Sequence, residues 1–292
     1  MRISVITPTY NRAYILGKCY GSLCAQTDHN FEWVVVDDGS TDDTEALVRS
    51  FIAQGRIDIR YIRQENGGKH RAHNTAVQHA SGELVVCLDS DDTLTEDAIE
   101  TARSVWQQKS DAALTGILAL RGDPEFRRPI CAALPKGISA ATMFDLNNRY
   151  GFYGDTVLFF RTELLRRIPF TTFDGERFIP ETNLYVDIDR NGKLLLLDKV
   201  LYLCEYLSDG LTAKYHRLLT GNPNGTADTY YKCMCMATNL KIKLKYAMLT
   251  NIYRALSTNR SALHFEEGRL LLWLTALPAA LIRRRFLSRF EK

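Results

Sequence analysis

The sequence predicts an α/β protein whose core is a mostly parallel sheet with helices on both faces. Up to about residue 108, short apolar runs alternate with segments of helical periodicity, the order that winds a parallel sheet. Turn-forming residues follow the strands, and three closely spaced carboxylates follow the fourth one. Because ligands of open α/β sheets bind at the carboxyl ends of the strands, the same observations locate a candidate site.

Four strands and four helices make up this first part. The strands are expected at 3–6, 33–36, 57–62 and 84–88, where Val, Ile and Leu dominate. The helices are expected at 13–25, 43–53, 70–79 and 96–107. Turns rich in Pro, Asn, Asp and Gly follow the first three strands at 8–11, 37–40 and 66–69. Four loops therefore converge on one edge of the sheet.

Beyond residue 108 the pattern loosens. Strand-like runs remain at 114–120, 156–160 and 194–197, separated by a loop that contains three prolines. We interpret them as a mixed extension of the sheet that carries the second half of the site, because one nucleotide-binding half cannot also enclose a second substrate. A boundary is expected near residue 215, and long helical patterns follow it.

Composition indicates a globular protein of one large domain with an appendage: 292 residues, 46% hydrophobic and 24% charged. The seven cysteines are odd in number, scattered and mostly inside apolar runs. This pattern argues against a disulfide framework or a zinc site and favours a reducing compartment. The first residues enter a strand directly, without the features of a signal peptide, so we expect a cytoplasmic protein.

The C-terminal part is basic. From Lys241 onward there are eleven Lys and Arg against three Glu, whereas the whole chain carries a net charge of only +3. The last apolar run, 270–282, contains Pro278 and is followed by three arginines at 283–285. It is too short to span a bilayer. Two interpretations stay open: a helix on an anionic membrane surface, or a helix packed on the main domain with a solvated basic end.

The fourth strand ends in Asp89, Asp91 and Asp92. Carboxylates packed this closely repel one another unless a cation lies among them, and ligands that are all oxygen favour Mg²⁺ or Mn²⁺. The alternative is a polar turn that caps the next helix, a role that suits Asp92 better than the other two.

Several classes of site are excluded. Neither G-x-x-x-x-G-K-[ST] nor G-x-G-x-x-G occurs, so P-loop nucleotidases and dinucleotide oxidoreductases are not indicated. His70, His73 and His79 have a spacing that does not bring all three to one turn of a helix. We interpret them as structural residues or residues at the rim of the site, and a position of His70 near the phosphates stays open.

Five motifs together resemble the family 2 glycosyltransferases of the GT-A fold. In order they are SVITPTYNR at 4–12, VVDDGSTD at 35–42, NGGKH at 66–70, ASGE at 80–83 and LDSDD at 88–92, with Asn74 between the third and fourth. The resemblance is firm to about residue 108, weaker to residue 212 and absent from the tail. It implies an inverting enzyme that moves a sugar from a nucleotide diphosphate donor.

The resemblance also implies roles for individual residues of the donor site. The expected nucleotide-sugar contacts are Pro8, Thr9, Tyr10, Asp38, Lys69, Asp89 and Ser90. The loop at 8–10 would cradle base and ribose, Tyr10 offering a stacking face. Asp38 would read the base, with Asp37 as the alternative. Lys69 would contact a phosphate, since an ammonium group is a suitable point charge.

The metal and the catalytic base are implied in the same way. Asp91 would bind Mn²⁺ or Mg²⁺ directly, and Asp89 would face the ribose or a metal-bound water; Asp92 is expected to support them or to cap a helix. Glu181, just after Pro180, would be the base that deprotonates the acceptor. The family often has Glu-Asp where this chain has Glu181-Thr182, so Glu176 and Asp187 stay open as alternatives. Residues 206–212 resemble a stretch that closes the acceptor side.

The expected organisation is a glycosyltransferase domain at 1–215, with a nucleotide-sugar-binding half at 1–108 and an acceptor and catalytic half at 109–215, followed by a basic helical extension at 216–292. The expected activity is metal-dependent transfer, from a UDP-sugar, to a glycan or lipid-linked acceptor in cell-surface polysaccharide synthesis. A peripheral contact with the inner face of the cell membrane is expected, and no nucleic acid. The alternatives are a nucleotidyltransferase and a non-catalytic nucleotide-sugar-binding subunit.

Overall fold

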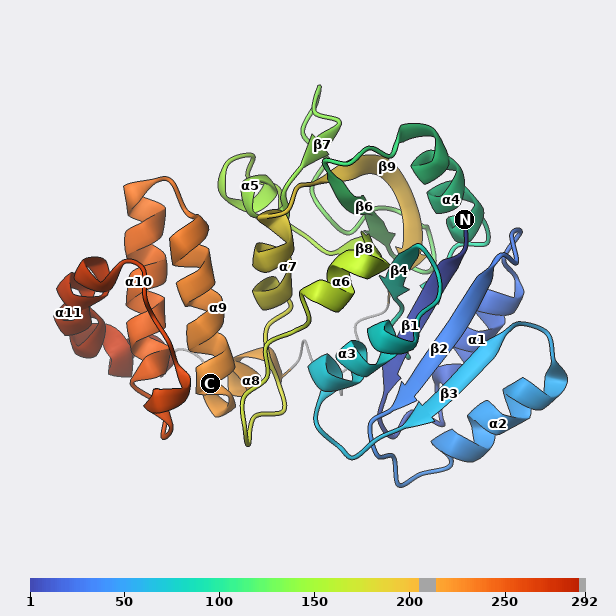
Figure 1. The fold of residues 1–292 in the computed structure, drawn as a ribbon, viewed down its shortest axis with the longest axis horizontal. Coiled ribbons are helices and arrows are strands. Elements are labelled where there is room, and N and C mark those ends of the chain that lie inside the picture. The colour runs from blue at the N-terminus through green and yellow to red at the C-terminus, as the bar shows by residue number, and fades with distance from the viewer. Residues whose placement is uncertain (205–213, 289–292) are drawn as a thin grey trace. The chain divides into compact units, whose positions relative to one another are not determined.

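The computed structural model describes residues 1–204 and 214–288. The chain divides into two compact units: residues 1–169 with 188–205, and residues 170–187 with 206–292. The first unit contains a mixed sheet with helices packed on it, and the second is helical (Figure 1). Within the described residues, no helix combines the length and apolar character needed to cross a membrane.

The first unit is organised around one sheet. Its strands are β1 (Ile3–Thr9), β2 (Phe31–Asp37), β3 (Ile59–Arg63), β4 (Leu84–Cys87), β5 (Thr93–Leu94), β6 (Leu114–Gly122), β7 (Ala140–Ala141), β8 (Thr156–Arg161) and β9 (Lys193–Leu203). Their order is β3-β2-β1-β4-β8-β6-β9-β5, with β7 paired to β9. The first four are parallel, whereas β8 is antiparallel to both of its neighbours. The expected parallel half with a mixed extension is confirmed.

Helices cover both faces of this sheet. They are α1 (Leu16–Cys24), α2 (Thr44–Gln54), α3 (Lys69–His79), α4 (Ala98–Lys109), α5 (Met143–Asn148) and α6 (Thr162–Arg167). α1, α2 and α4 share a core with alternate residues of the central strands, among them the fully buried Trp33 and Trp106. α3 packs against β1 and β2 on the opposite face (Figure 1). Alternate strand residues therefore meet different helices, as the period of a strand requires.

The second unit is built from helices. They are α7 (Thr182–Asp189), which begins in this unit, α8 (Tyr215–Gly221), α9 (Pro223–Met236), α10 (Leu240–Arg254), a 3₁₀ turn at Arg260–Ala262 and α11 (Arg269–Leu287). α10 lies between α9 and α11 (Figure 1). The Asn239 side chain caps α10, because its oxygen accepts hydrogen bonds from the backbone N–H groups of Lys241 and Ile242.

The strands and helices expected from the sequence are present, with ends that differ by a few residues, and two short strands, β5 and β7, were not anticipated. One alternative is wrong: Asp92 does not cap the following helix, because α4 begins at Ala98 and β5 intervenes. The predicted boundary near residue 215 stays a prediction. The structure groups 170–187, which includes Glu181, with the helical unit.

A buried carboxylate fixes the start of α5 to the end of α7. Asp189 accepts hydrogen bonds from the backbone N–H groups of Met143 and Phe144, at 3.1 and 2.8 Å, at the first turn of α5. Burial, with a smaller contribution from Asp145, raises the pKa of Asp189 to about 7 despite these bonds. This carboxyl group is therefore more easily protonated in the folded chain than in the unfolded one.

We expect Asp189→Asn to change how stability depends on pH. The pKa of Asp189 lies above the unfolded value of about 4, so between pH 4 and 7 the folded state holds more protons and wild-type stability falls as pH rises. Asn does not titrate in this range. The free energy of unfolding of the variant, relative to that of wild type, should therefore rise with pH by up to about 1.4 kcal/mol per pH unit. Urea unfolding from pH 5 to 8 measures it; parallel curves would contradict the assignment.

Candidate active site

The acidic turn at residues 89–92 follows the carboxyl end of β4. Its backbone closes through a hydrogen bond from the Asp92 N–H to the Asp89 carbonyl oxygen, at 3.1 Å. Asp92 and Ser90 are buried, whereas Asp89 and Asp91 keep partial exposure. The turn therefore presents two of its three carboxylates at the edge of the sheet and holds the third beneath them.

Tyr202 of β9 supports this turn from below. Its hydroxyl accepts a hydrogen bond from the Asp89 backbone N–H at 3.0 Å and donates one to the Asp92 carboxylate at 2.7 Å. Pairing between β5 and β9, which places Leu94 opposite Tyr202, brings the ring under the turn. The guanidinium group of Arg121 lies 4.2 Å from the centre of the Tyr202 ring and adds positive charge nearby.

The carboxylates of the turn destabilise one another's charge. Burial and then the Asp89 carboxylate raise the pKa of Asp91, while Arg12 and Lys69 oppose the rise. For Asp92, burial and Asp89 raise the pKa to about 7, and the Tyr202 hydroxyl and Arg121 act in the opposite direction. Added positive charge beside the turn would favour the ionised forms of Asp91 and Asp92.

Lys69 brings positive charge to the turn from the neighbouring loop. It is the first residue of α3, and its ammonium nitrogen lies 2.7 Å from a carboxylate oxygen of Asp89. Gly68 precedes it with φ of +96°, a conformation that favours glycine. The structure thus brings together Lys69 and the acidic turn, two features that the sequence placed on separate loops.

The loop before Lys69 is held by Asp38. The two oxygens of its buried carboxylate accept hydrogen bonds from the side chains of Gln64 and Asn66 and from the backbone N–H groups of Gly67 and Gly68, at 2.7 to 3.2 Å. These occupy the four acceptor positions of a carboxylate. A base N–H would have to share an oxygen with this loop, so the predicted base-reading role of Asp38 stays a prediction.

The alternative residue, Asp37, is also engaged: it accepts from the Ser40 N–H and the Tyr61 hydroxyl, each at 2.7 Å. The end of β1 lies next to it in the sheet, where Thr9 is opposite Asp37, so Pro8 and Thr9 belong to a strand and not to the expected loop. Both are buried, the Thr9 hydroxyl oxygen has no hydrogen-bond partner among the described residues, and Tyr10 is 47% exposed. An accessible ring beside a buried hydroxyl oxygen is compatible with the predicted contact to base and ribose.

In the helical unit, the three candidate bases have different surroundings. Glu176 is buried and accepts hydrogen bonds from the backbone N–H groups of Asn224 and Gly225, at 2.7 and 2.8 Å, in the first turn of α9. Burial raises its pKa and these bonds lower it. Glu176 therefore acts as a clamp between the segment before α7 and the start of α9.

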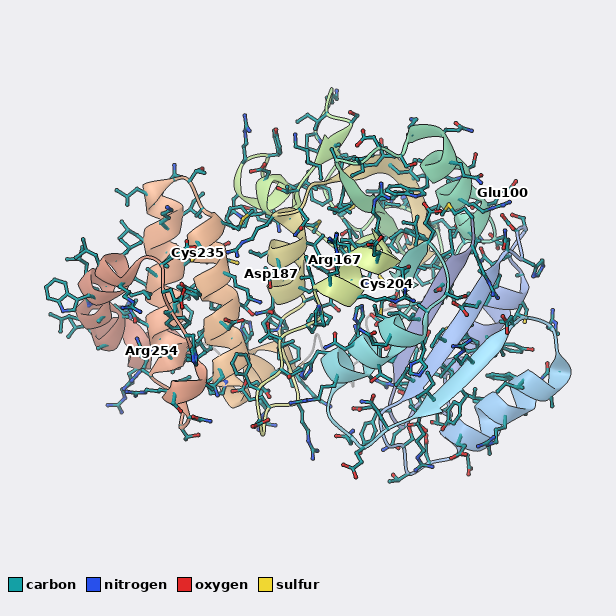
Figure 2. All side chains as sticks on the ribbon, in the orientation of Figure 1. Glu100, Arg167, Asp187, Cys204, Cys235 and Arg254 are labelled. Carbon is teal, nitrogen blue, oxygen red and sulfur yellow. The ribbon has the colours of Figure 1, made fainter. Side chains whose placement is uncertain are left out.

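Asp187 is also committed to structure. It accepts a hydrogen bond at 2.5 Å from the ammonium group of Lys232, which also bonds Thr171 and Asn183 at 2.9 Å. Figure 2 labels Asp187 on α7, beside α9, which carries Lys232. This polar network fixes α7 against α9 in the helical unit.

Glu181 differs from both. It lies just before α7, its carbonyl oxygen accepts the N–H groups of Leu184 and Tyr185, and its side chain is exposed. The Tyr185 hydroxyl donates to one carboxylate oxygen at 3.1 Å. Of the three candidates, Glu181 alone has a carboxylate that is both exposed and anchored at a helix start.

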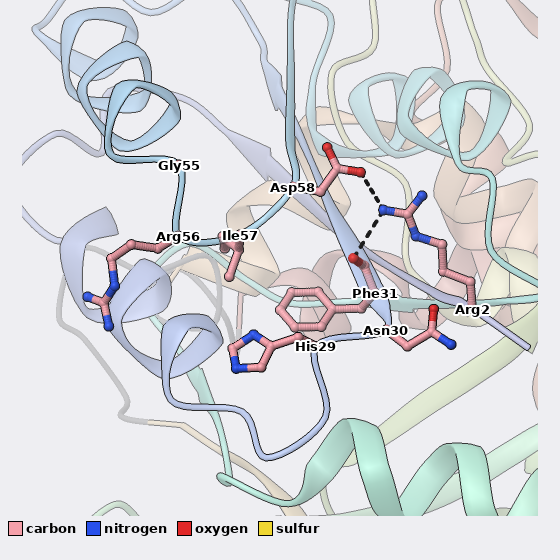
Figure 3. Close-up of a pocket in the computed structure, with 8 residues that line it drawn as sticks. All are labelled: Arg2, His29, Asn30, Phe31, Gly55, Arg56, Ile57 and Asp58. Carbon is pink, nitrogen blue, oxygen red and sulfur yellow. Dashed lines mark hydrogen bonds and ion pairs between the residues drawn. The ribbon is translucent and has the colours of Figure 1, made fainter.

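Two features lie elsewhere. Figure 3 shows a pocket lined by residues that include Arg2, Phe31 and Asp58, near the amino ends of the strands; no predicted site residue lines it. His70 and His73 are buried on α3, and His79 bonds the Thr75 carbonyl group. The stretch 206–212 lies outside the described residues.

Sequence reasoning missed the residues that support the acids. Tyr202 and Arg121 hold the acidic turn, and Gln64 and Asn66 hold Asp38. Asn66 lies in a recognised motif, but Tyr202 is 110 residues from Asp92 and stands in an ordinary apolar strand. Nothing local to Tyr202 in the sequence distinguishes it from a core tyrosine.

Comparison with protein families agrees with this arrangement. A model described as glycosyl transferase family 2 matches residues 4–169, more than half of the chain. The chain belongs to glycosyl transferase family 2. The resemblance inferred from the five motifs is thereby confirmed.

Two relatives of this family 2 chain carry specific names. Glycosyltransferase GlyA of Streptococcus pneumoniae is 40% identical over 114 residues, 39% of this chain and 16% of GlyA. The poly(ribitol-phosphate) β-N-acetylglucosaminyltransferase TarS of Staphylococcus aureus is 29% identical over 184 residues, 62% of this chain and 30% of TarS. The matches thus span far less than two thirds of either relative.

Solved structures of similar fold extend over nearly the whole family 2 chain. Residues 1–349 of S. aureus TarS in complex with UDP-GlcNAc give a TM-score of 0.61 at 18% identity, covering 98% of this chain and 92% of that one. The mannosyltransferase PcManGT of Pyrobaculum calidifontis, in complex with GDP-Man and Mn²⁺, gives 0.58 at 20% identity, covering 98% and 83%. At these identities the comparison establishes the fold, which is of the GT-A type with a C-terminal helical region.

Tyr202→Phe should weaken the first unit. The change removes the hydroxyl between the Asp89 N–H and the buried Asp92 carboxylate, so we expect a loss of about 1–3 kcal/mol in the free energy of unfolding. Urea denaturation at pH 8 measures it. Tyr185→Phe is the control: its hydroxyl bonds an exposed carboxylate, and its loss should stay below about 0.5 kcal/mol. Equal effects of the two changes would refute a special role for Tyr202.

Proposed function

We propose that this protein is an inverting, metal-dependent glycosyltransferase that moves a sugar from a nucleotide diphosphate donor to a glycan or lipid-linked saccharide. The observation that carries the proposal is the acidic turn at 89–92, met by Lys69 at the carboxyl edge of the sheet. Family membership supports sugar transfer as the reaction class.

A UDP-sugar is the donor that we favour. The TarS structures of similar fold are complexes with UDP-GlcNAc and with UDP, and TarS by name transfers N-acetylglucosamine. PcManGT in complex with GDP-Man also has a similar fold, and guanine is therefore the alternative base. In this chain, the exposed ring of Tyr10 and the buried hydroxyl of Thr9 are the groups proposed to contact base and ribose.

The acidic turn suits a divalent cation. Asp91 and Asp92 have raised pKa values because they are buried near Asp89, and a cation would relieve that repulsion. The described residues contain no cluster of three or more Asp, Glu, His or Cys side chains placed to hold a metal ion. Asp91 and Asp89 would therefore supply part of the coordination and the donor diphosphate the rest, as is common for Mg²⁺. A bound Mn²⁺ or Mg²⁺ would supply a Lewis acid next to the diphosphate.

Lys69 and the loop that holds it serve the phosphates in this proposal. The ammonium group now paired with Asp89 is close enough to the turn to contact a phosphate oxygen of a donor bound there. Asp38 fixes the preceding loop through four hydrogen bonds, so the position of Lys69 is set before the donor arrives. Such preorganisation reduces the entropy lost on binding.

Glu181 is the proposed general base. As the acceptor oxygen attacks the anomeric carbon, the carboxylate of Glu181 takes the proton of the acceptor hydroxyl, the bond from that carbon to the diphosphate oxygen breaks, and the nucleoside diphosphate leaves. One displacement gives inversion at the anomeric carbon. The structural commitments of Glu176 and Asp187 support the choice of Glu181.

The setting follows from the same proposal. We place the enzyme in the cytoplasm, in contact with the inner face of the cell membrane, adding sugars during cell-surface polysaccharide synthesis; two named relatives, GlyA and TarS, are glycosyltransferases of bacteria. The domain limits proposed are 1–215 for the catalytic part and 216–292 for the basic extension. Release of pyrophosphate in place of a nucleoside diphosphate would identify a nucleotidyltransferase, and absence of any turnover a binding subunit.

Asp91→Asn should abolish metal-dependent donor binding. Wild type is expected to gain thermal stability with UDP-GlcNAc and Mn²⁺ together, because a ligand that binds only the native state raises its apparent stability. The variant should melt as wild type does without ligand and show no gain with both. A thermal-shift titration measures this; a variant that keeps the full Mn²⁺-dependent gain rules out Asp91 as the ligand.

Glu181→Gln should remove turnover and leave donor affinity intact. Loss of a general base typically costs about 10²- to 10⁴-fold in rate. The assay is UDP release from the donor with Mn²⁺, with water as the acceptor, and donor Kd is followed by calorimetry. Glu176→Gln is the matched control: it should lower stability through the α9 clamp while turnover stays within about threefold. If Glu176→Gln loses turnover and Glu181→Gln keeps it, the general base is Glu176.

A further inference from the structure

α11 is apolar on all of its sides over its first four turns, but the described residues of the chain cover only one of these sides. Between Leu270 and Ile282 its only side chain able to hydrogen-bond, besides the Trp273 indole, is that of Thr275, which is buried. An all-apolar helix is normally enclosed by protein or by lipid. The uncovered side of α11 therefore needs an explanation.

The covered side packs on α10 and α9. Leu272 shares a cluster with Met234 and Ala247, and Ala279 shares another with Ile252 and Tyr253. The side-chain amide of Asn251 on α10 donates to the Leu272 carbonyl at 2.7 Å and to the Thr275 hydroxyl at 3.0 Å. These contacts fix the rotation of α11 about its axis. They therefore also determine which of its residues face away from α10.

The opposite side, here called the outer face of α11, is a continuous apolar stripe. It consists of Leu270, Trp273, Leu274, Leu277 and Leu281, whose exposed fractions range from 54% to 75%. Their spacing of three and four residues puts them on one side of a helix about 28 Å long. In Figure 2 side chains project from α11 on the side away from α10. Surfaces this apolar and continuous mark interaction sites.

Positive charge lies at the end of the same stripe. Arg284 and Arg285 are exposed and fall one turn beyond Leu281, so they flank the outer face at its C-terminal end. Arg269 is exposed at the other end, next to Glu266 and Glu267. From residue 241 onward the chain has eleven basic residues and three acidic ones. A partner of negative charge and apolar interior would complement both features.

We propose that the outer face of α11 is a docking surface for an anionic lipid bilayer, with the helix lying along the interface. The five apolar side chains would enter the boundary between headgroups and acyl chains, and Arg284 and Arg285 would contact anionic headgroups. The indole N–H of Trp273 suits the same boundary, where one end of a side chain is wet. This proposal names the part of the chain that would make the membrane contact included in the proposed function. It rests on the proposed function only for its biological purpose.

The chemistry of the stripe favours lipid over another protein. Protein interfaces combine an apolar centre with a polar rim and carry about one hydrogen bond per 100–200 Å². From Leu270 to Leu281 the outer face offers one donor, the indole N–H of Trp273, and no side-chain acceptor. Lipid demands apolar area and positive charge, and the outer face supplies both. Pairing with a second copy is the competing outcome of the test.

The test is binding of the full chain, without donor or metal, to vesicles of phosphatidylcholine alone or with 30% phosphatidylglycerol. Co-flotation gives the partition coefficient. Tryptophan emission reports the contact, because Trp33 and Trp106 are fully buried and Trp273 is 73% exposed. Anionic vesicles should shift the emission to shorter wavelength, and Trp273→Phe should remove the shift while binding persists. Absence of flotation with anionic vesicles overturns the proposal.

Variants separate the two parts of the surface. Leu277→Glu with Leu281→Glu should lower partition at least tenfold, since each leucine buries apolar area in the lipid. Arg284→Gln with Arg285→Gln should lower it about 30-fold on anionic vesicles, at about 1 kcal/mol per arginine, and leave neutral vesicles unaffected. Phe126→Glu, which removes a similarly exposed ring from the first unit, should bind as wild type. Wild-type binding by the double leucine variant overturns the proposal.

Two further measurements give clear outcomes. All four positions are exposed, and unchanged far-ultraviolet circular dichroism confirms that the variants fold. Light scattering without lipid tests the competing occupant: a wild-type dimer that the leucine changes convert to monomer assigns the outer face to a second copy. Donor hydrolysis in solution does not involve this surface. If the wild-type chain hydrolyses the donor but does not bind anionic vesicles, the docking surface alone is refuted. If it binds the vesicles but does not hydrolyse the donor, the proposed function alone is refuted.

Discussion

The structure of the candidate site depends on one electrostatic constraint, the confinement of three carboxylates in a four-residue turn. Asp89, Asp91 and Asp92 repel one another, and burial intensifies the effect, as the raised pKa values of Asp91 and Asp92 indicate. The surrounding elements each offset part of this repulsion. Tyr202 donates to the most buried carboxylate, Arg121 adds charge behind that ring, and Lys69 pairs with Asp89. The residual negative charge at the sheet edge is the basis of the cation site that we propose there.

In the helical unit the carboxylates of Glu176 and Asp187 are not clustered as in the acidic turn, but each holds two segments of the chain together. Glu176 and Asp187 are used to hold α9 against α7 and the segment before it, through backbone N–H groups in one case and the ammonium group of Lys232 in the other. Both contacts brace the chain on either side of Glu181. An exposed acid between two braced points keeps a defined position without being buried, and this is the property a general base requires.

The fold and most of the candidate site could be predicted because their signals are local. Strands such as 84–88 are short apolar runs, the acids come just after one strand, and Lys69 comes at the end of the turn that follows another. Features that depend on residues distant in sequence could not be predicted. Tyr202 is placed by pairing between β5 and β9, two strands of which the first was not expected, and the four hydrogen bonds on Asp38 come from a loop about 28 residues away. Similarly, the apolar run of α11 is apparent in the sequence, but which of its sides faces α10 is not.

The support from Tyr202 has a consequence for the order of folding. During synthesis, the five family motifs are complete by residue 92, yet the strand that carries Tyr202, which holds the acidic turn, begins at Lys193. Until β9 has added beside β6, the turn carries its repulsion without the Tyr202 hydroxyl that offsets part of it. Contacts of such long separation form slowly relative to local ones. The nascent chain therefore acquires the motifs of a transferase well before it can acquire the complete site, and an N-terminal fragment ending before β9 would hold the five motifs without the Tyr202 hydroxyl that supports the acidic turn.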